Sequence, residues 1–297
     1  MKKIFFFAII LIACKPNKET NKSTDFEIGI IADCQYCNCE TQGKRFYKQS
    51  PDKFKSAIKE LNTKNLDYTI HLGDFIDRNF ESFDTVLPIW NRLKSKKYHV
   101  LGNHDFSVQD SLKPLVASKM GLKNRYYSFI KNNWRFIVLD GNDLSYHGAL
   151  TYEKEKETDS LFNLLKINNE PNLQTWNGGL SSSQLQWIEK ELKDAKKNDE
   201  YVGFYCHFPA GRVGEAHNLW NYKQFLQLIN SYNNVKFYFN GHNHNGDYLE
   251  KNKVHHITFK GMLDTKKASA FAIAKFTKDS IFIQGYGRET SRRLKIN

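Results

Sequence analysis

Five short polar motifs follow one another along the chain and contain the residue types that bind metal ions. They are Asp33-x-Gln35, Gly73-Asp74-x-x-Asp77, Gly102-Asn103-His104-Asp105, His207 and Gly241-His242-x-His244. Carboxylate, amide and imidazole groups suit a pair of divalent ions about 3.5–4 Å apart, with one carboxylate shared between the two ions. Each motif alone is a common turn sequence, but most of the five directly follow an apolar run. Their types, order and placement therefore predict a two-metal hydrolytic site.

The segments between the motifs have the hydrophobic periods of an α/β protein. Apolar runs predict strands at 26–32, 68–72, 98–101, 126–130, 134–139, 201–206, 235–239, 254–259, 270–276 and 281–284. Helical spacing of apolar residues predicts helices over 50–61, 83–93, 181–192 and 222–229. The motifs fall in the loops just after strands, where α/β folds bind their ligands. The pattern predicts a layered α/β sandwich rather than separate domains.

Residues 140–180 interrupt this alternation with a polar stretch that is rich in Asn and Glu and ends at Asn177-Gly178-Gly179. Two interpretations of this insertion stay open. It could form a lid or a wall of the substrate site, or it could be a surface excursion without a functional role.

The N-terminus has the pattern of an export signal. A basic Met1-Lys2-Lys3 precedes an apolar run that is too short to span a bilayer and ends at Cys14. The sequence LIAC at this point resembles a bacterial lipobox, in which the cysteine becomes lipidated. We expect residues 1–14 to be a lipoprotein signal peptide, 15–25 a polar tether, and 26–297 a single domain. Acylation would anchor the mature protein outside the cytoplasm, in a bacterial cell envelope; a plain secretory signal is the alternative.

The chain is basic, with a formal net charge of +12 at pH 7. Nucleic acid or phospholipid headgroups could match such a charge. Many of the lysines, however, form Lys-Lys pairs on expected surface helices without interleaved aromatic residues. This pattern favours a solvated surface, and we expect no nucleic-acid partner and find no sign of a protein partner. The charge would still help to capture a small anionic substrate.

Cysteines gather beside the first motif. Cys34, Cys37 and Cys39 lie within six residues, and Cys206 precedes His207. The cluster lacks the second cysteine pair that a zinc site would need, and a disulfide would suit an oxidising envelope. The favoured interpretation is that these cysteines are small residues packed around the metal-site loops.

The motif set resembles that of the calcineurin-like metallophosphoesterases, and further segments are similar to those of the manganese-dependent ADP-ribose/CDP-alcohol diphosphatases. The closer likeness includes Gln35, where the superfamily usually has histidine, and the segments IADCQYCNCE, RFY at 45–47, NGGLSSSQLQW at 177–187, NLWNY at 218–222 and GHNHNGDY at 241–248. It extends from about Asp25 to the C-terminus. The resemblance implies a four-layer α/β/β/α sandwich of two mixed β-sheets flanked by helices. It also implies hydrolysis of nucleoside diphosphate-linked compounds, such as ADP-ribose or CDP-alcohols, into two monophosphates.

Chemistry and resemblance together suggest a role for each motif residue. One ion would bind Asp33, Gln35, Asp74 and His244, and the other would bind Asp74, Asn103, His207 and His242. His104 would contact the phosphate and aid the leaving group, with Asp105 orienting its ring. Asp77 and Arg78 would brace the loop of the bridging Asp74.

The ion and the substrate contacts are also expected from these residues. The motif set predicts two divalent ions. An amide oxygen at Gln35 is a weaker metal ligand than imidazole, so we expect Mn²⁺ to be the preferred ion. Loop aromatics near the motifs could stack a nucleobase or close the pocket: Tyr36, Phe46, Phe208 and Trp220. The arginines that could reach the phosphates are Arg45, Arg212 and Arg288.

Two other functions use the same residues. The metal site could instead serve an envelope phosphomonoesterase, or a phosphodiesterase for cyclic nucleotides or lipid-linked diphosphates, since one fold serves many substrates. The chain could also be a non-catalytic surface lipoprotein, although the intact His104 and the full set of metal ligands argue against this.

Overall fold

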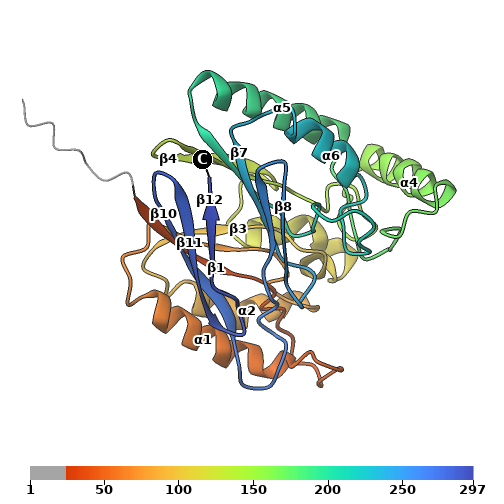
Figure 1. The fold of residues 1–297 in the computed structure, drawn as a ribbon. Helices are drawn as coiled ribbons and strands as arrows, with labels where there is room; N and C mark the ends of the chain where they lie inside the picture. Colours follow the sequence, from red (N-terminus) through yellow and green to blue (C-terminus); the bar gives the residue numbers. More distant parts are fainter. Residues whose placement is uncertain (1–24, 297) are drawn as a thin grey trace, which may run out of the picture.

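A computed structural model describes residues 25–296 and contains two six-stranded β-sheets packed face to face, with helices on both outer sides (Figure 1). The predicted signal peptide, Cys14 and residues 15–24 of the predicted tether lie outside the described residues. The predicted four-layer sandwich of two mixed sheets is confirmed. Within residues 25–296, no helix combines the length and the apolar character needed to cross a membrane.

The first sheet has the strand order β12-β11-β10-β1-β2-β3. Its parallel strands are β1 (Phe26–Ile31), β2 (Tyr68–His71) and β3 (Lys96–His99), and its antiparallel strands are β10 (Ala270–Phe276), β11 (Ser280–Gly287) and β12 (Arg292–Lys295). Helices α1 (Ser50–Leu61) and α2 (Phe83–Trp90) cover its outer face. The carboxyl ends of β1, β2 and β3 therefore point to one edge of the sandwich.

The second sheet has the order β4-β5-β6-β7-β9-β8. Its strands are β4 (Tyr127–Lys131), β5 (Trp134–Val138), β6 (Tyr201–Tyr205), β7 (Val235–Asn240), β8 (Asp247–Lys251) and β9 (Val254–Thr258). Helices α5 (Ser182–Lys197) and α6 (Tyr222–Ile229) cover its outer face. The strands β5, β6, β7 and β9 are parallel, so the loops after β6 and β7 emerge together.

Apolar residues fill the space between the layers. Between the sheets, Phe26 stacks on Phe276 with ring centroids 4.5 Å apart, and Phe136 and Phe237 pack against the same ring. Strands that are buried on both faces need nearly continuous apolar sequences, which is why the runs at 26–32 and 235–239 predicted them. This rigid core supports the loops that carry the motifs.

Several elements differ from their predicted positions. The strand β3 (Lys96–His99) is shifted by two residues toward the N-terminus relative to the predicted strand at 98–101. Val100 and Leu101 are buried but lie just after the strand. The edge strands β8 and β12 were not predicted, because edge strands in solvent need few apolar residues. Helix α4 (Tyr152–Ile167) lies within the 140–180 insertion, and it buries only Thr158 and Leu165.

Short elements complete the chain. Single 3-10 turns occur at Tyr47–Gln49, Phe80–Ser82 and His104–Phe106, and a longer one at Asp110–Leu115 leads into α3 (Val116–Lys119). The turn at His104–Phe106 matters most for the site, because it directs the His104 side chain away from that of Asn103.

Candidate metal centre

The five motifs come together where the loops of both sheets meet. Several of their residues have left-handed backbones, with φ of 51° at Asp33, 46° at Gln35, 55° at Asp74 and 69° at His242. This conformation costs an L-residue roughly 1–2 kcal/mol, and such strain tends to gather at functional sites. The loops also pack closely, since a Cβ on Gly102 would lie 2.1 Å from Asp74 Oδ1. The motif glycine is therefore required for this approach.

One group of donors converges on the ring of His207. Its Nε2 lies 3.2 Å from Asp74 Oδ2, 3.2 Å from Asn103 Oδ1 and 3.1 Å from His242 Nδ1. The other ring nitrogen, Nδ1, lies 2.9 Å from the carbonyl oxygen of Leu72. That carbonyl can only accept, so it fixes the proton on Nδ1 and leaves a lone pair on Nε2.

His242 is held in the same manner by a different partner. Its Nε2 lies 3.0 Å from Asn177 Oδ1, and the amide of Asn177 donates to the carbonyls of Asn172 and Ala216. The proton of His242 therefore sits on Nε2, and the lone pair of Nδ1 faces the lone pair of His207. Four acceptor atoms therefore surround one point: Nε2 of His207, Nδ1 of His242, Oδ2 of Asp74 and Oδ1 of Asn103. A single proton at this point could satisfy only one contact between them. A cation at this point would satisfy all four.

A second group of donors lies beside the first and shares Asp74. Asp33, Asp74 and His244 are close enough to bind one ion together, and Gln35 is buried next to them. His244 Nδ1 lies 2.9 Å from Asp264 Oδ1, and its Nε2 faces Asp33 Oδ1 at 3.6 Å. The carboxylate of Asp264 thus orients this imidazole with Nε2 toward the site.

Unpartnered oxygen atoms show that the second group also suits a cation. Within residues 25–296, Asp33 Oδ2 and Gln35 Oε1 are buried without a hydrogen-bond partner. Burial raises the pKa of Asp33 to about 6, so its charge needs compensation. Buried polar atoms are rarely left unpaired, and the donor set fits two divalent ions that share the carboxylate of Asp74.

The protein itself keeps Asp74 ionised. Burial opposes ionisation, but His207 and His104 outweigh it and hold the pKa of this carboxyl well below its usual range. In return, Asp74 and Asp33 overcome burial and raise the pKa of His207 to about 9. The proton that this implies and a bound metal ion would compete for the same lone pair.

His104 lies beside the two groups of donors, and Asp77 holds its ring. Its Nδ1 forms an ion pair with Asp77 Oδ1, and Nε2 lies 3.5 Å from a guanidinium nitrogen of Arg45. Burial lowers the pKa of His104, but Asp74 and Asp77 outweigh it and raise that pKa above its usual value. The ring is thus kept in position to give a proton to a group bound near Arg45.

The predicted role of Asp105 is wrong. Its carboxylate points into the loops and accepts hydrogen bonds from the backbone amides of Phe75, Ile76 and Gly102, at 2.7, 3.1 and 2.9 Å. It ties the second and third motifs together, while Asp77 orients the ring of His104. Adjacent side chains in this turn diverge, so the neighbour in sequence is not the neighbour in space.

Comparison with known proteins places the chain in a family. A model of the calcineurin-like phosphoesterases matches residues 26–246. The chain belongs to the calcineurin-like phosphoesterase family. Manganese-dependent ADP-ribose/CDP-alcohol diphosphatases from Xenopus laevis and Homo sapiens are 30% and 29% identical to this phosphoesterase. These matches cover 91% and 94% of this chain, and 90% and 96% of those proteins.

A solved structure confirms the fold. The phosphoesterase matches a dimetal phosphatase from Danio rerio with a TM-score of 0.83 and 25% identity, over 93% of this chain and 100% of that one. The two sheets thus have the architecture of a known dimetal phosphatase.

The predicted substrate contacts divide into two sets. Phe208 and Trp220 are buried, at 0% and 2% exposure, and pack within the phosphoesterase, so they cannot stack on a substrate. Tyr36, Phe46 and Arg45 are partly exposed beside the motifs. Arg212 pairs with Asp247, and Arg288 donates to the carbonyl of Gly261. Of the three arginines, Arg45 contacts a motif side chain.

Two functional partners were missed from the sequence. Asn177 lies in the recognised NGG segment but had no role, and Asp264 lies outside every motif. Trp176 and His217 also flank His242, with ring centroids 5.3 and 5.6 Å away. The end of the 140–180 insertion therefore contacts the phosphoesterase site, a contact that no local pattern indicates.

The cysteines also differ from the favoured interpretation. Cys34 and Cys206 are free and buried, as packing residues should be. Cys37 and Cys39 instead form a disulfide, which was one of the alternatives. The bond lies beside Asp77 and not in a separate zinc site.

Proposed function

We propose that this phosphoesterase is a manganese-dependent diphosphatase. It hydrolyses the phosphoanhydride bond of nucleoside diphosphate-linked compounds, such as ADP-ribose or CDP-alcohols, into two monophosphates. The names of its relatives support this substrate class. The arrangement of Gln35 supports the choice of ion, because its Nε2 donates to Asp77 Oδ1 at 3.1 Å and leaves Oε1 free toward the site.

The ligands divide into two sets that share one carboxylate. Asp33, Gln35, Asp74 and His244 would hold one ion, and Asp74, Asn103, His207 and His242 would hold the other. The first set contains one imidazole and several oxygen atoms, a composition that Mn²⁺ accepts more readily than softer ions do. When bound, the two ions would supply an activated water molecule and charge stabilisation at the phosphoryl oxygens.

The remaining chemistry falls to residues of the chain. Arg45 would bind a phosphate oxygen and position the scissile bond beside His104. His104 would then donate its Nε2 proton to the departing phosphate oxygen, while Asp77 stabilises the charged imidazole. Asp105 would keep the second and third motif loops in register during turnover.

A panel of substrates tests this function. The purified protein, supplied with Mn²⁺, is assayed on ADP-ribose, CDP-choline, a cyclic nucleotide and p-nitrophenyl phosphate. Hydrolysis of the first two to monophosphates is the expected result. Turnover of only the cyclic nucleotide or the monoester would replace the proposal with a phosphodiesterase or phosphomonoesterase, and no turnover of any would favour a non-catalytic lipoprotein.

We also propose that the enzyme is anchored in a bacterial cell envelope through Cys14. The basic start, the apolar run and the LIAC sequence support this proposal. Mass spectrometry of the mature N-terminus tests it, since a diacylated or triacylated Cys14 is expected. An unmodified Met1, or a cleavage that removes Cys14, would contradict it.

A further inference from the structure

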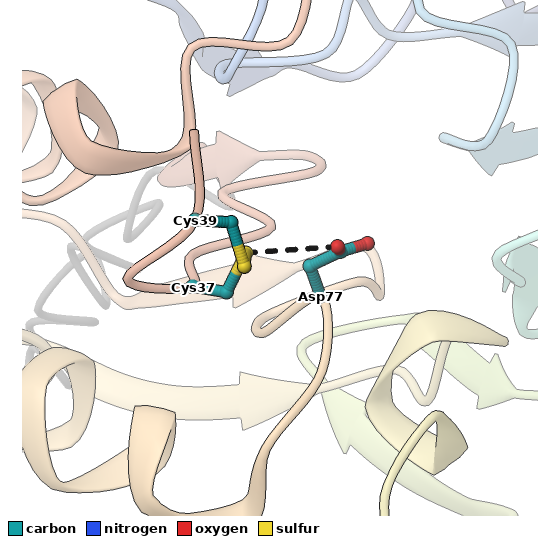
Figure 2. Close-up of side chains that lie close together, drawn as sticks. All are labelled: Cys37, Cys39 and Asp77. Atoms are coloured by element: carbon teal, nitrogen blue, oxygen red, sulfur yellow. Dashed lines mark hydrogen bonds between the residues drawn. A yellow bond between two sulfur atoms is a disulfide. The ribbon is translucent and has the colours of Figure 1, made fainter. Parts of the chain in front are cut away.

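A disulfide lies directly against the residue that orients His104. Figure 2 shows Cys37 and Cys39 bonded to each other and facing the carboxylate of Asp77. Cys37 Sγ lies 3.7 Å from Asp77 Oδ2, and both residues are buried. Cys39 is partly exposed, so it is the member of the pair that lies nearer to solvent.

Within residues 25–296, four groups contact the carboxylate of Asp77, and three of them are polar groups already placed in the site. Its Oδ1 accepts from Gln35 Nε2 and pairs with His104 Nδ1. Its Oδ2 accepts from Arg78 Nε at 2.8 Å. The fourth neighbour is the disulfide, whose sulfur has no hydrogen to donate. The carboxylate is therefore shared only among groups that the site needs.

The backbone joins the same two segments. The amide of Tyr36 donates to the carbonyl of Phe75 at 3.3 Å, and the amide of Asp77 donates to the carbonyl of Tyr36 at 2.9 Å. The Cys37 side chain also packs in a small apolar cluster with Tyr47 and Leu263. The disulfide thus fixes the direction of a side chain that forms one wall around Asp77.

We propose that the Cys37–Cys39 disulfide is a positioning element that holds Asp77, and through it His104, in the arrangement for turnover, and that reduction by a dithiol lowers kcat. The effect on turnover rests on the proposed function, whereas the effect on His104 does not. Cys37 and Cys39 touch no substrate in this account; they act through Asp77.

The chemistry of reduction explains the expected loss. A dithiol attacks the sulfur of the partly exposed Cys39, the S–S bond to Cys37 breaks, and a second thiolate of the reagent releases Cys39. Each cysteine sulfur gains one electron and one proton, and the reagent becomes a disulfide. The new Cys37 thiol then lies beside Asp77 Oδ2 as a donor, where it competes with Arg78. Asp77 becomes a weaker and less firmly held acceptor for His104.

Kinetics of the metal-loaded enzyme test the proposal. The protein is reduced with dithiothreitol, desalted without oxygen, and assayed with Mn²⁺ on its best substrate. We expect kcat to fall ~10-fold or more, as for other partners behind a site, with KM nearly unchanged and kcat restored by reoxidation. The double variant Cys37→Ala/Cys39→Ala should show the low kcat without a redox response, and Cys206→Ser should retain that response.

Two results would overturn the proposal. One is an unchanged kcat after thiol counting shows complete reduction. The other is a lower melting temperature with an unchanged kcat per folded molecule, because that is the behaviour of a disulfide that only stabilises the fold. Both measurements use the reduced wild-type chain, so neither depends on whether the double variant folds.

A spectroscopic readout separates this proposal from the substrate assignment. The imidazole ¹⁵N resonances of His104, assigned by their loss in His104→Gln, are compared in the oxidised and reduced protein without metal. Reduction should shift them, because the hydrogen bond from Nδ1 to Asp77 weakens. Unchanged resonances would overturn the proposal even if no substrate were found, while a shift without any turnover would support it and count only against the proposed function.

Discussion

The two sheets contribute different chemistry to the candidate metal centre. Loops of the first sheet supply oxygen atoms from Asp33, Gln35, Asp74 and Asn103, whereas loops of the second supply imidazole nitrogens from His207, His242 and His244. Three of the four oxygen ligands are aimed by strained backbones with positive φ. Each imidazole is aimed by a hydrogen bond to its other nitrogen. Short side chains are thus positioned by their own loops, and rings are positioned by partners elsewhere in the chain.

Replacing Asp74 should remove the link between the two groups of metal ligands. Because Asp74 belongs to both ligand groups, Asp74→Asn should lower kcat/KM by more than the ~10–100-fold typical of outer partners. Calorimetric titration with Mn²⁺ should also show fewer than two sites. Asp84→Asn, which alters an exposed carboxylate paired with Lys119, is the matched control. Two intact sites in Asp74→Asn would contradict the assignment.

His104 belongs to neither group of metal ligands, so replacing it should affect catalysis without affecting metal binding. We expect His104→Gln to lower kcat ~10²–10⁴-fold, the usual contribution of a general acid. Its Mn²⁺ affinity should match that of the wild type. A large loss of metal affinity would show that His104 is itself a ligand.

The imidazole partners should matter for metal binding more than their distance from the ions suggests. Asp264→Ala and Asn177→Ala each remove the acceptor for one ring proton, and each should weaken Mn²⁺ binding ~10–100-fold. Asn177→Asp keeps an acceptor and should retain most of the affinity. Equal affinity in all three variants would mean that these contacts do not orient the rings.

Exchanging one oxygen ligand for an imidazole would make the ligand sets of the two ions more alike. Gln35→His should tighten binding at the first ion and broaden the range of active metals, because imidazole is the stronger donor. Activity with Mn²⁺, Zn²⁺ and Mg²⁺, measured beside metal affinity, checks this. Unchanged affinity would remove Gln35 from the ligand set.

The smallest effect is expected for His99, a buried histidine that lacks, among residues 25–296, the hydrogen-bond partner that each metal-site histidine has. Within the described chain, neither ring nitrogen of His99 has a hydrogen-bond partner, and burial lowers its pKa to about 3. The unfolded chain, with a pKa near 6.5, therefore binds more protons between these values, so stability is lost as pH falls from about 6.5 toward 3. Urea unfolding should show a shallower acid loss for His99→Phe, and parallel pH profiles would contradict this.

Local sequence patterns predicted the features of the molecule that depend on neighbouring residues in the chain. Long apolar runs marked the central strands, and the motif residues do come together at the strand ends. The pattern could not show that Asp77, rather than Asp105, holds His104, because the direction of each side chain depends on how the loops pack. Asp264 and the role of Asn177 were likewise beyond it, since their partners lie 20 and 65 residues away. The polar edges β8 and β12 have no apolar run to reveal them.

The most direct test of the shared centre is a crystal structure of the Mn²⁺-loaded protein with anomalous data at the manganese edge. The account predicts two peaks about 3.5–4 Å apart, both in contact with Asp74. One should contact Asp33, Gln35 and His244, and the other Asn103, His207 and His242. A single peak, or two peaks with ligands from only one sheet, would contradict the account.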